Sequence, residues 1–96
     1  MIMATITKEE IFQEIKSYIE KFGGANNNWC VGVTSDAQNA LFKENKVDQH
    51  NSKWIYRALD SNENAQWVKN SLSGIGLTPL QDNNQNGTIV FVFLNS

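Results

Sequence analysis

Near its C-terminal end the chain carries an unbroken apolar run, Ile89-Val90-Phe91-Val92-Phe93-Leu94, directly after Thr88. A strand that is covered on one face alternates apolar and polar residues, whereas a continuous apolar run is typical of a strand that is buried on both faces. Such a strand is unsuited to the exposed edge of a sheet. The sequence therefore predicts that residues 88–94 form the central strand of a sheet whose two faces are both covered.

The spacing of apolar residues indicates two further strands and three helices. Branched and aromatic residues predict strands over residues 29–34 and 53–59. Apolar residues at helical spacing predict helices over residues 8–22 and 36–46, and a third helix that begins after Asp60 and ends at Gly74 to Gly76. The first helix begins with Thr7-Lys8-Glu9-Glu10, which matches a capping box.

These elements follow one another in the order α-β-α-β-α-β, which predicts a single small α+β domain over residues 1–96. We expect a three-stranded sheet with the C-terminal strand in the centre and the helices packed against it. Strands 29–34 and 53–59 would then lie on either side of the centre, parallel to each other and antiparallel to the central strand.

Composition narrows the classes of partner. The formal net charge is −2 and the pI is near 5.2, so the chain has no general attraction for nucleic acids or anionic membranes. Cys30 is the only cysteine, which excludes an internal disulfide and a paired-cysteine zinc site and fits a reducing compartment. No apolar run approaches the roughly 20 residues of a membrane span. We therefore expect a cytoplasmic protein without a membrane segment and without a cofactor.

One short motif resembles a known enzyme family. Cys30-Val31-Gly32-Val33-Thr34, followed by residues 35–41, resembles the second half of the signature of GIY-YIG endonucleases. In that signature a Tyr-Ile-Gly-x-Thr-like strand leads through a turn into a helix with Arg-Leu and then His. Residues 65–69 are similar to the helical segment in which the family places its metal-binding Glu. The likeness covers residues 29–72 and implies a GIY-YIG-like scaffold.

The residues that carry the chemistry of that family are replaced in this chain. The family's strand Tyr corresponds to Cys30, its helix Arg to Ala40 and its metal-binding Glu to Lys69. Its helix His corresponds to Glu44 or Asn45, depending on one residue of register. Cleavage of a phosphodiester by that design needs a carboxylate for the metal ion and a cation for the phosphate. The resemblance therefore implies a degenerate scaffold that does not cut by the family's mechanism.

The order of the strands departs from the family as well. The family begins with a strand that pairs with the Tyr-Ile-Gly strand, and no such strand precedes residue 29 here. Strand 88–94 can take that place, with Phe91 near the Tyr position, because the termini of compact domains generally lie close together. The resemblance is therefore that of a circularly permuted relative.

A second candidate site consists of basic and aromatic residues in the middle of the chain. Bases stack on aromatic rings while cations follow the phosphates, so this composition is compatible with nucleic-acid binding. Acidic residues in the same span nearly cancel the charge, and we favour the interpretation that the aromatic rings pack the fold and the lysines are solvated. The residues of this candidate binding site are Lys43, Lys46, Trp54, Tyr56, Arg57 and Trp67.

Other arrangements of reactive side chains are weaker. Cys30 and His50 are a candidate nucleophile and base, but a cysteine inside a strand is more often buried and inert. Asp36, Asp48, Asp60 and Glu63 lack the spacing of metal ligands, and we interpret them as helix caps and turn residues.

The sequence thus favours a non-catalytic binding module that acts through a protein partner. Compact modules of this kind suit phage or mobile-element inhibitors of host systems, by analogy alone. One alternative is an active nuclease or nucleic-acid-binding protein whose site residues have moved. Another is a homo-oligomeric protein that binds a small ligand beside Gly32.

Overall fold

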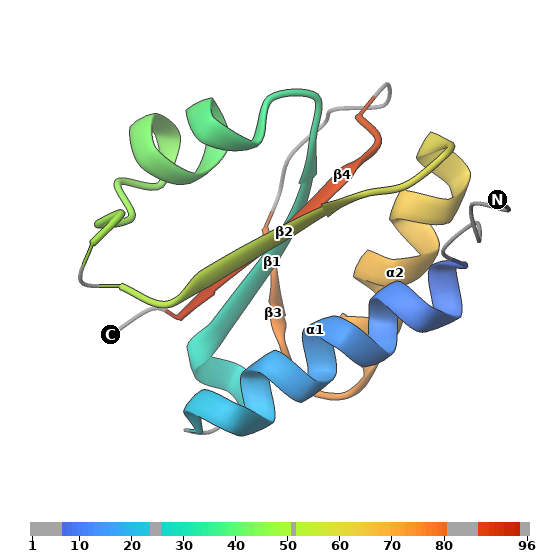
Figure 1. Cartoon of the computed structure of the whole chain (residues 1–96), viewed down its shortest axis with the longest axis horizontal. Coiled ribbons are helices and arrows are strands. Elements are labelled where there is room, and N and C mark those ends of the chain that lie inside the picture. The colour runs from blue at the N-terminus through green and yellow to red at the C-terminus, as the bar shows by residue number, and fades with distance from the viewer. Residues whose placement is uncertain (1–6, 24–25, 51, 81–86, 95–96) are drawn as a thin grey trace, which may run out of the picture.

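The computed structural model describes residues 7–23, 26–50, 52–80 and 87–94. The strands form one mixed sheet of four strands in the order β2-β4-β1-β3. Two helices lie on one face of this sheet and a short helical segment, η2, lies on the other (Figure 1). The α+β class is as predicted. In chain order the elements are α1 (Lys8–Phe22), η1 (Asn26–Asn28), β1 (Trp29–Thr34), η2 (Asn39–Glu44), β2 (Trp54–Ala58), α2 (Asn62–Gly74), β3 (Thr78–Pro79) and β4 (Ile89–Leu94).

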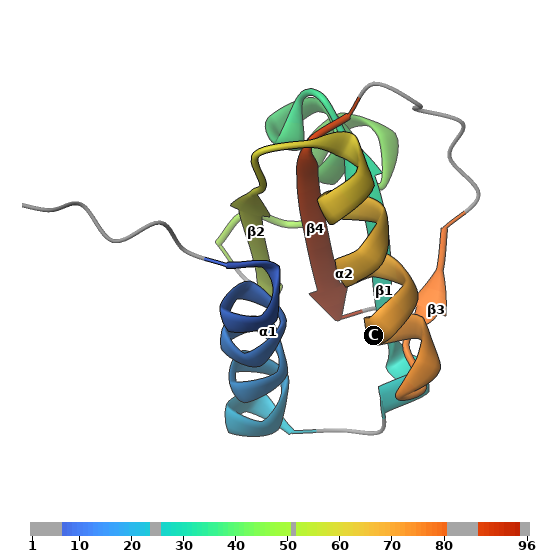
Figure 2. The ribbon, with the colours of Figure 1, turned by 90° about the vertical axis from the view of Figure 1, so that its right-hand side faces the viewer.

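β4 is an inner strand, as its apolar run predicts. It lies between β1 and β2 and is antiparallel to both (Figure 2). Val90 and Val92 belong to the apolar cluster beneath α1 and α2, whereas Phe91 and Phe93 belong to the cluster beneath η2. All four side chains are buried. The two clusters explain why the four inner positions of this strand are all apolar.

α1 begins and ends where its sequence signals place it. The backbone N–H of Glu10 donates to Thr7 Oγ1 at 3.1 Å, and the Thr7 hydroxyl donates to Glu10 Oε1 at 3.3 Å. The helix stops at Gly23, whose φ of 76° is a conformation that favours glycine. One stripe of the helix is buried against the sheet; it consists of Ile11, Ile15 and Ile19.

α2 is capped in the same way. Ser61 Oγ accepts a hydrogen bond of 3.1 Å from the backbone N–H of Asn64, which satisfies a donor in the first turn of the helix. The buried stripe of this helix packs beside α1 over β1 and β4. It consists of Ala65, Val68 and Leu72, all three of which the helical spacing predicts.

The sheet has one strand more than the sequence predicts. Thr78 and Pro79 pair in parallel with Cys30 and Val31 of β1. The prediction of three strands in a strict α-β-α-β-α-β order is therefore wrong, because β3 lies between α2 and β4. A strand of two residues, one of them a proline, has no periodicity to detect. It is fixed instead by the short connection from α2 and by the buried side chain of Leu77.

The helix predicted over residues 36–46 is shorter and differently wound. Asn39–Glu44 is a π-helix, in which each backbone N–H bonds to the carbonyl five residues earlier. The backbone N–H of Asn45 donates to the Ala40 carbonyl at 3.1 Å. Side chains support the same pitch, because Asn39 Nδ2 donates to Glu44 Oε2 at 2.8 Å and Asn45 Nδ2 donates to the Ala40 carbonyl at 2.7 Å.

Candidate functional site

β2 forms one edge of the sheet, and part of its backbone faces away from its neighbours. Leu94 N–H donates to the Lys53 carbonyl at 2.9 Å, and Leu59 N–H donates to the Thr88 carbonyl at 2.7 Å. The odd-numbered residues of this segment therefore bond to β4. In an antiparallel pair the residues between them direct their N–H and C=O groups to the other side. The residues that present their backbone to the free edge are Trp54, Tyr56 and Ala58.

Two of these outward groups are held by side chains. The Trp54 N–H donates to the Tyr18 hydroxyl at 3.2 Å, and the Tyr56 carbonyl accepts from Arg57 Nη1 at 2.8 Å. Both contacts confirm that the even-numbered residues face outward. Within the described part of the chain, the outward N–H groups of Tyr56 and Ala58 have no hydrogen-bond partner. These donors are available to the backbone of another chain.

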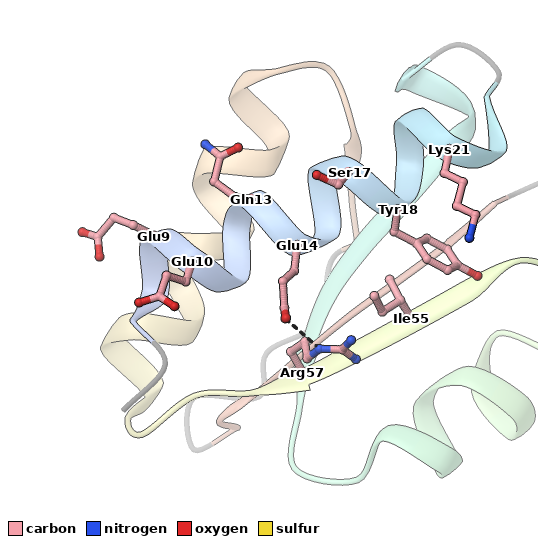
Figure 3. A pocket seen from close by; sticks show the side chains of 9 residues that line it. All are labelled: Glu9, Glu10, Gln13, Glu14, Ser17, Tyr18, Lys21, Ile55 and Arg57. Atoms are coloured by element: carbon pink, nitrogen blue, oxygen red, sulfur yellow. Dashed lines mark hydrogen bonds and ion pairs between the residues drawn. The ribbon is translucent and has the colours of Figure 1, made fainter. Parts of the chain in front are cut away.

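A groove runs along the same edge, between α1 and β2 (Figure 3). Its main part has a volume of about 710 Å³, and a second hollow of about 460 Å³ continues it along the strand. Ile55 forms part of the floor, and Arg57 crosses the groove to Glu14 in an ion pair of 3.0 Å. The residues that line the main part are Glu9, Glu10, Gln13, Glu14, Ser17, Tyr18, Lys21, Ile55 and Arg57.

The charges in this groove are separated along its length. Glu9 and Glu10 extend from the first turn of α1, and Glu14 lies one turn further on (Figure 3). Lys21 lies at the other end of the helix (Figure 3). Lys8 is next in sequence to the glutamates but is not part of the lining, because its Nζ lies over the ring of Trp67, 4.9 Å from the ring centroid. One end of the groove is therefore acidic.

The two exposed large apolar side chains among the described residues both lie at this edge. Tyr56 is 38% exposed and stacks on Trp54, with ring centroids 6.1 Å apart. Phe22, also 38% exposed, ends α1 beside Tyr18, with ring centroids 4.7 Å apart. Exposed aromatic surface on a small protein commonly marks an interaction site. The edge of β2 therefore combines unpaired backbone donors with apolar side chains.

The opposite edge of the sheet differs. β3 is two residues long and contains Pro79, which has no backbone N–H. Short edge strands and prolines are devices by which proteins prevent the addition of further strands. The sheet thus has one protected edge and one edge that is only partly capped.

The positions that correspond to the GIY-YIG chemistry are not all brought together. Cys30 and Gly32 alternate on β1 with the residues that face α1 and α2, and Cys30 packs in one cluster with Ala40. Asn45 caps η2 on the same side of the sheet. Lys69 lies on α2, on the opposite side, and its Nζ donates to the Leu80 carbonyl at 3.0 Å. The sheet therefore separates Lys69 from the other four.

The candidate nucleic-acid residues are also dispersed. Trp54 and Tyr56 lie on the side of η2, and Lys43 and Lys46 are exposed on or next to that segment. Arg57 points to the other side, toward α1. Trp67 is half-buried on α2, where it meets the ring of Phe12 edge-on. These residues do not form one surface.

The weaker candidates have structural roles or lie apart. Asp36 Oδ1 accepts from the Asn39 N–H at 3.1 Å at the start of the helical segment, and Asp48 Oδ1 accepts from the His50 N–H at 3.0 Å within a turn. His50 is exposed in a turn, whereas Cys30 is buried in the sheet. Among the residues that the structure describes, no three His, Cys, Asp or Glu side chains converge as a metal site.

Burial raises the pKa of the Cys30 thiol above its ordinary value of 9.0. The unfolded chain ionises this thiol as the pH passes the ordinary value, whereas the folded chain keeps it protonated to higher pH. The free energy of unfolding is therefore expected to fall above about pH 9, by at most about 1.4 kcal/mol per pH unit. Urea unfolding of the wild type and of Cys30→Ala between pH 8 and 10 measures this, and equal slopes for both proteins would contradict it.

Sequence reasoning did not identify the α1 side of this groove. The glutamates of α1 and Lys21 have the spacing of a solvated helix face. In an isolated helix these side chains would simply face water. The one available signal is indirect: a sheet in which the C-terminal strand is central leaves strand 53–59 at an edge. Which helix flanks that edge is decided by tertiary packing.

No family model, curated protein or solved structure matches the chain. No described helix has the length and apolar character needed to cross a membrane. The site is therefore interpreted from its geometry alone.

Proposed function

We propose that this chain is a non-catalytic protein-binding module that adds an extended segment of a partner protein to the free edge of β2. The observation that carries the proposal is the pair of unpaired N–H groups at Tyr56 and Ala58, beside a groove of about 710 Å³. In strand addition the main chain supplies hydrogen bonds and pockets for alternate side chains supply specificity. The edge of β2 offers both elements.

The two caps on this edge are compatible with exchange by a partner strand. The Tyr18 hydroxyl and the Arg57 guanidinium belong to side chains at the surface of the groove, and the Arg57–Glu14 pair is 43% and 44% exposed. An exposed ion pair is worth only about 0–1 kcal/mol. A partner strand that replaces these contacts with backbone hydrogen bonds therefore loses little.

The non-catalytic part of the proposal is supported by the residues at the GIY-YIG positions. Cys30, Ala40 and Asn45 serve packing and capping, and Lys69 lies on the other side of the sheet. We keep a degenerate, circularly permuted GIY-YIG-like scaffold as a proposal about the origin of the fold. A module that occupies a segment of another protein suits inhibition, and we include an inhibitor of a host system in the proposal.

Selection of extended peptides from a random library on the folded protein, followed by amide hydrogen exchange of the complexes, tests the binding mode. We expect the selected peptides to slow exchange at Tyr56 and Ala58. Tyr56→Pro removes one outward N–H without removing a bond to β4, and is expected to weaken binding at least tenfold. Tyr56→Val keeps the N–H and serves as the matched control.

Three results would overturn the proposal. The first is a failure to select any peptide, and the second is protection confined to α2 or η2. The third is metal-dependent cleavage of DNA or RNA that is lost on substitution of Cys30 or Lys69, which would replace the binding module by a nuclease.

A further inference from the structure

We infer that the segment taken by the β2 edge is a basic one, with its cationic side chains at the end of the groove formed by the first turns of α1. The inference rests on the proposed function and names the chemistry of the partner. Three carboxylates lie at that end, Glu9, Glu10 and Glu14, against one guanidinium from Arg57. The complementary charge on a bound strand is positive.

The pleat of an added strand decides which of its side chains meet these carboxylates. Successive side chains of a strand point to opposite faces of the sheet, and opposite residues in neighbouring strands share a face. Ile55 and Arg57 point to the face that carries α1, so alternate residues of the added strand enter the groove. The residues between them lie beside Tyr56 and Trp54 on the other face.

This alternation defines a segment with two kinds of position. On the groove side, a basic residue lies near Glu9 and Glu10, and an apolar residue lies near Ile55 and the ring of Tyr18. On the opposite side, apolar residues continue the aromatic surface of Trp54 and Tyr56. The expected ligand is therefore an extended segment that has apolar residues on both faces and a basic cluster at one end.

The carboxylates have few competing cations. Glu14 Oε1 forms an ion pair with Arg57 Nε at 3.0 Å, and Glu10 Oε1 accepts a hydrogen bond from the Thr7 hydroxyl at 3.3 Å. Lys8 is directed toward Trp67, and Lys21 lies at the far end of α1. A basic side chain of the partner therefore meets carboxylates that no lysine of α1 neutralises locally.

A second copy of this chain fits the edge less well than an isolated segment. Antiparallel pairing of two β2 strands extends the sheet with both copies facing the same way. α1 lies next to β2 on the face that carries the groove (Figure 2). Pairing of two copies would therefore bring two α1 helices to that face, one beside the other. The groove lining comes mainly from the outer side of α1, which an incoming helix would cover. A single extended strand brings no helix to this face, so the lining residues of α1 stay accessible.

Three designed peptides test the inference on the folded wild-type protein. Each has about eight residues, alternates threonine and valine, and carries at one end two arginines, two glutamines or two glutamates. Nuclear magnetic resonance titration at low salt gives the affinities and the shifts of the Tyr56 and Ala58 amides. We expect the arginine peptide to bind about three- to tenfold more tightly than the glutamine peptide, and the glutamate peptide to bind most weakly.

Variants locate the source of this preference. The double variant Glu9→Gln/Glu10→Gln is expected to remove the preference for arginine, so that the arginine and glutamine peptides bind to it with equal affinity. The matched control, Glu20→Gln/Glu63→Gln, changes the net charge equally at exposed positions outside the groove and is expected to keep it.

The outcomes separate the inference from the proposed function. If the three peptides shift the Tyr56 and Ala58 amides with equal affinity, the inference fails and strand addition stands. If no peptide shifts these amides, strand addition itself fails. If the protein dimerises with concentration and protects these amides without any peptide, the occupant is a second copy and the inference is overturned.

Discussion

Replacement of Trp29 by alanine is expected to lower the free energy of unfolding by about 3–5 kcal/mol. The Trp29 side chain is fully buried in the cluster beneath α1 and α2. Its Nε1 donates to the Gly23 carbonyl at 3.2 Å, and its ring meets Tyr18 edge-on, with centroids 5.9 Å apart. The substitution therefore removes a large apolar volume, a hydrogen bond and a ring contact at once.

The ring of Trp29 also supports the groove, through its contact with Tyr18. Tyr18 is held between Trp29 and Phe22, and its hydroxyl accepts from the Trp54 N–H at the edge of β2. Loss of the Trp29 ring leaves Tyr18 without one of its two aromatic neighbours. We therefore expect amide exchange at Trp54 to accelerate in Trp29→Ala beyond the change that the lower global stability produces.

Trp67→Ala is the matched control. Trp67 is half-buried on α2, where its ring meets Phe12 with centroids 6.2 Å apart. The same change of residue type is expected to cost about 1–2 kcal/mol there, because less apolar surface leaves water. Urea unfolding of both variants provides the comparison. An equal decrease in the free energy of unfolding for both variants would contradict the prediction that the buried Trp29 contributes more to stability than Trp67.

Much of the fold is predictable because its signals are local. The unbroken apolar run of β4 requires cover on both faces, and the structure supplies it from α1 and α2 on one side and η2 on the other. The isoleucines of α1 recur at helical spacing, and Thr7 and Gly23 mark its ends. These features depend on neighbouring residues and on periodicity, both of which a sequence displays.

The parts that the sequence does not predict depend on distant contacts. β3 exists because the chain after α2 passes beside β1, where Leu80 N–H donates to the Val31 carbonyl at 2.8 Å. The π-helical winding of η2 brings together residues that are five apart, Asn39 with Glu44 and Asn45 with the Ala40 carbonyl, whereas the side chains that meet on an α-helix are three or four apart. In both cases a non-local partner or a small energy difference decides the local geometry.

The candidate site is non-local in the same sense. The acidic end of the groove comes from the first turn of α1, whereas the unpaired backbone donors come from Tyr56 and Ala58 of β2. More than forty residues separate these segments in the chain. Of the motif with a family resemblance, Cys30 and Ala40 pack on the opposite face of the sheet, whereas Val31 and Val33 lie in the core beneath α1 and α2. None of the positions that the family resemblance singles out lines the groove.

Replacement of Gly87 by alanine is expected to lower the free energy of unfolding by about 2–3 kcal/mol. A Cβ atom at this position would lie 2.7 Å from the carbonyl carbon and 2.8 Å from the carbonyl oxygen of Thr34. These are backbone atoms at the end of β1, where Thr34 pairs with Ile89 of β4. The clash cannot be relieved by rotation of a side chain, so one of the two strands must move.

A shift of Gly87 also disturbs the start of α2, because its carbonyl accepts a hydrogen bond of 2.7 Å from Asn62 Nδ2. Gly74→Ala is the matched control, since nothing lies within 4 Å of a Cβ atom there and the residue is helical. Alanine in a helix is favoured over glycine by about 0.5–1 kcal/mol, so Gly74→Ala is expected to stabilise the protein. Thermal and urea unfolding of both variants measure whether each substitution lowers or raises the free energy of unfolding. A neutral Gly87→Ala would mean that the corner between β1 and β4 yields without cost, and that the close contact with Thr34 does not fix the register of the central strand.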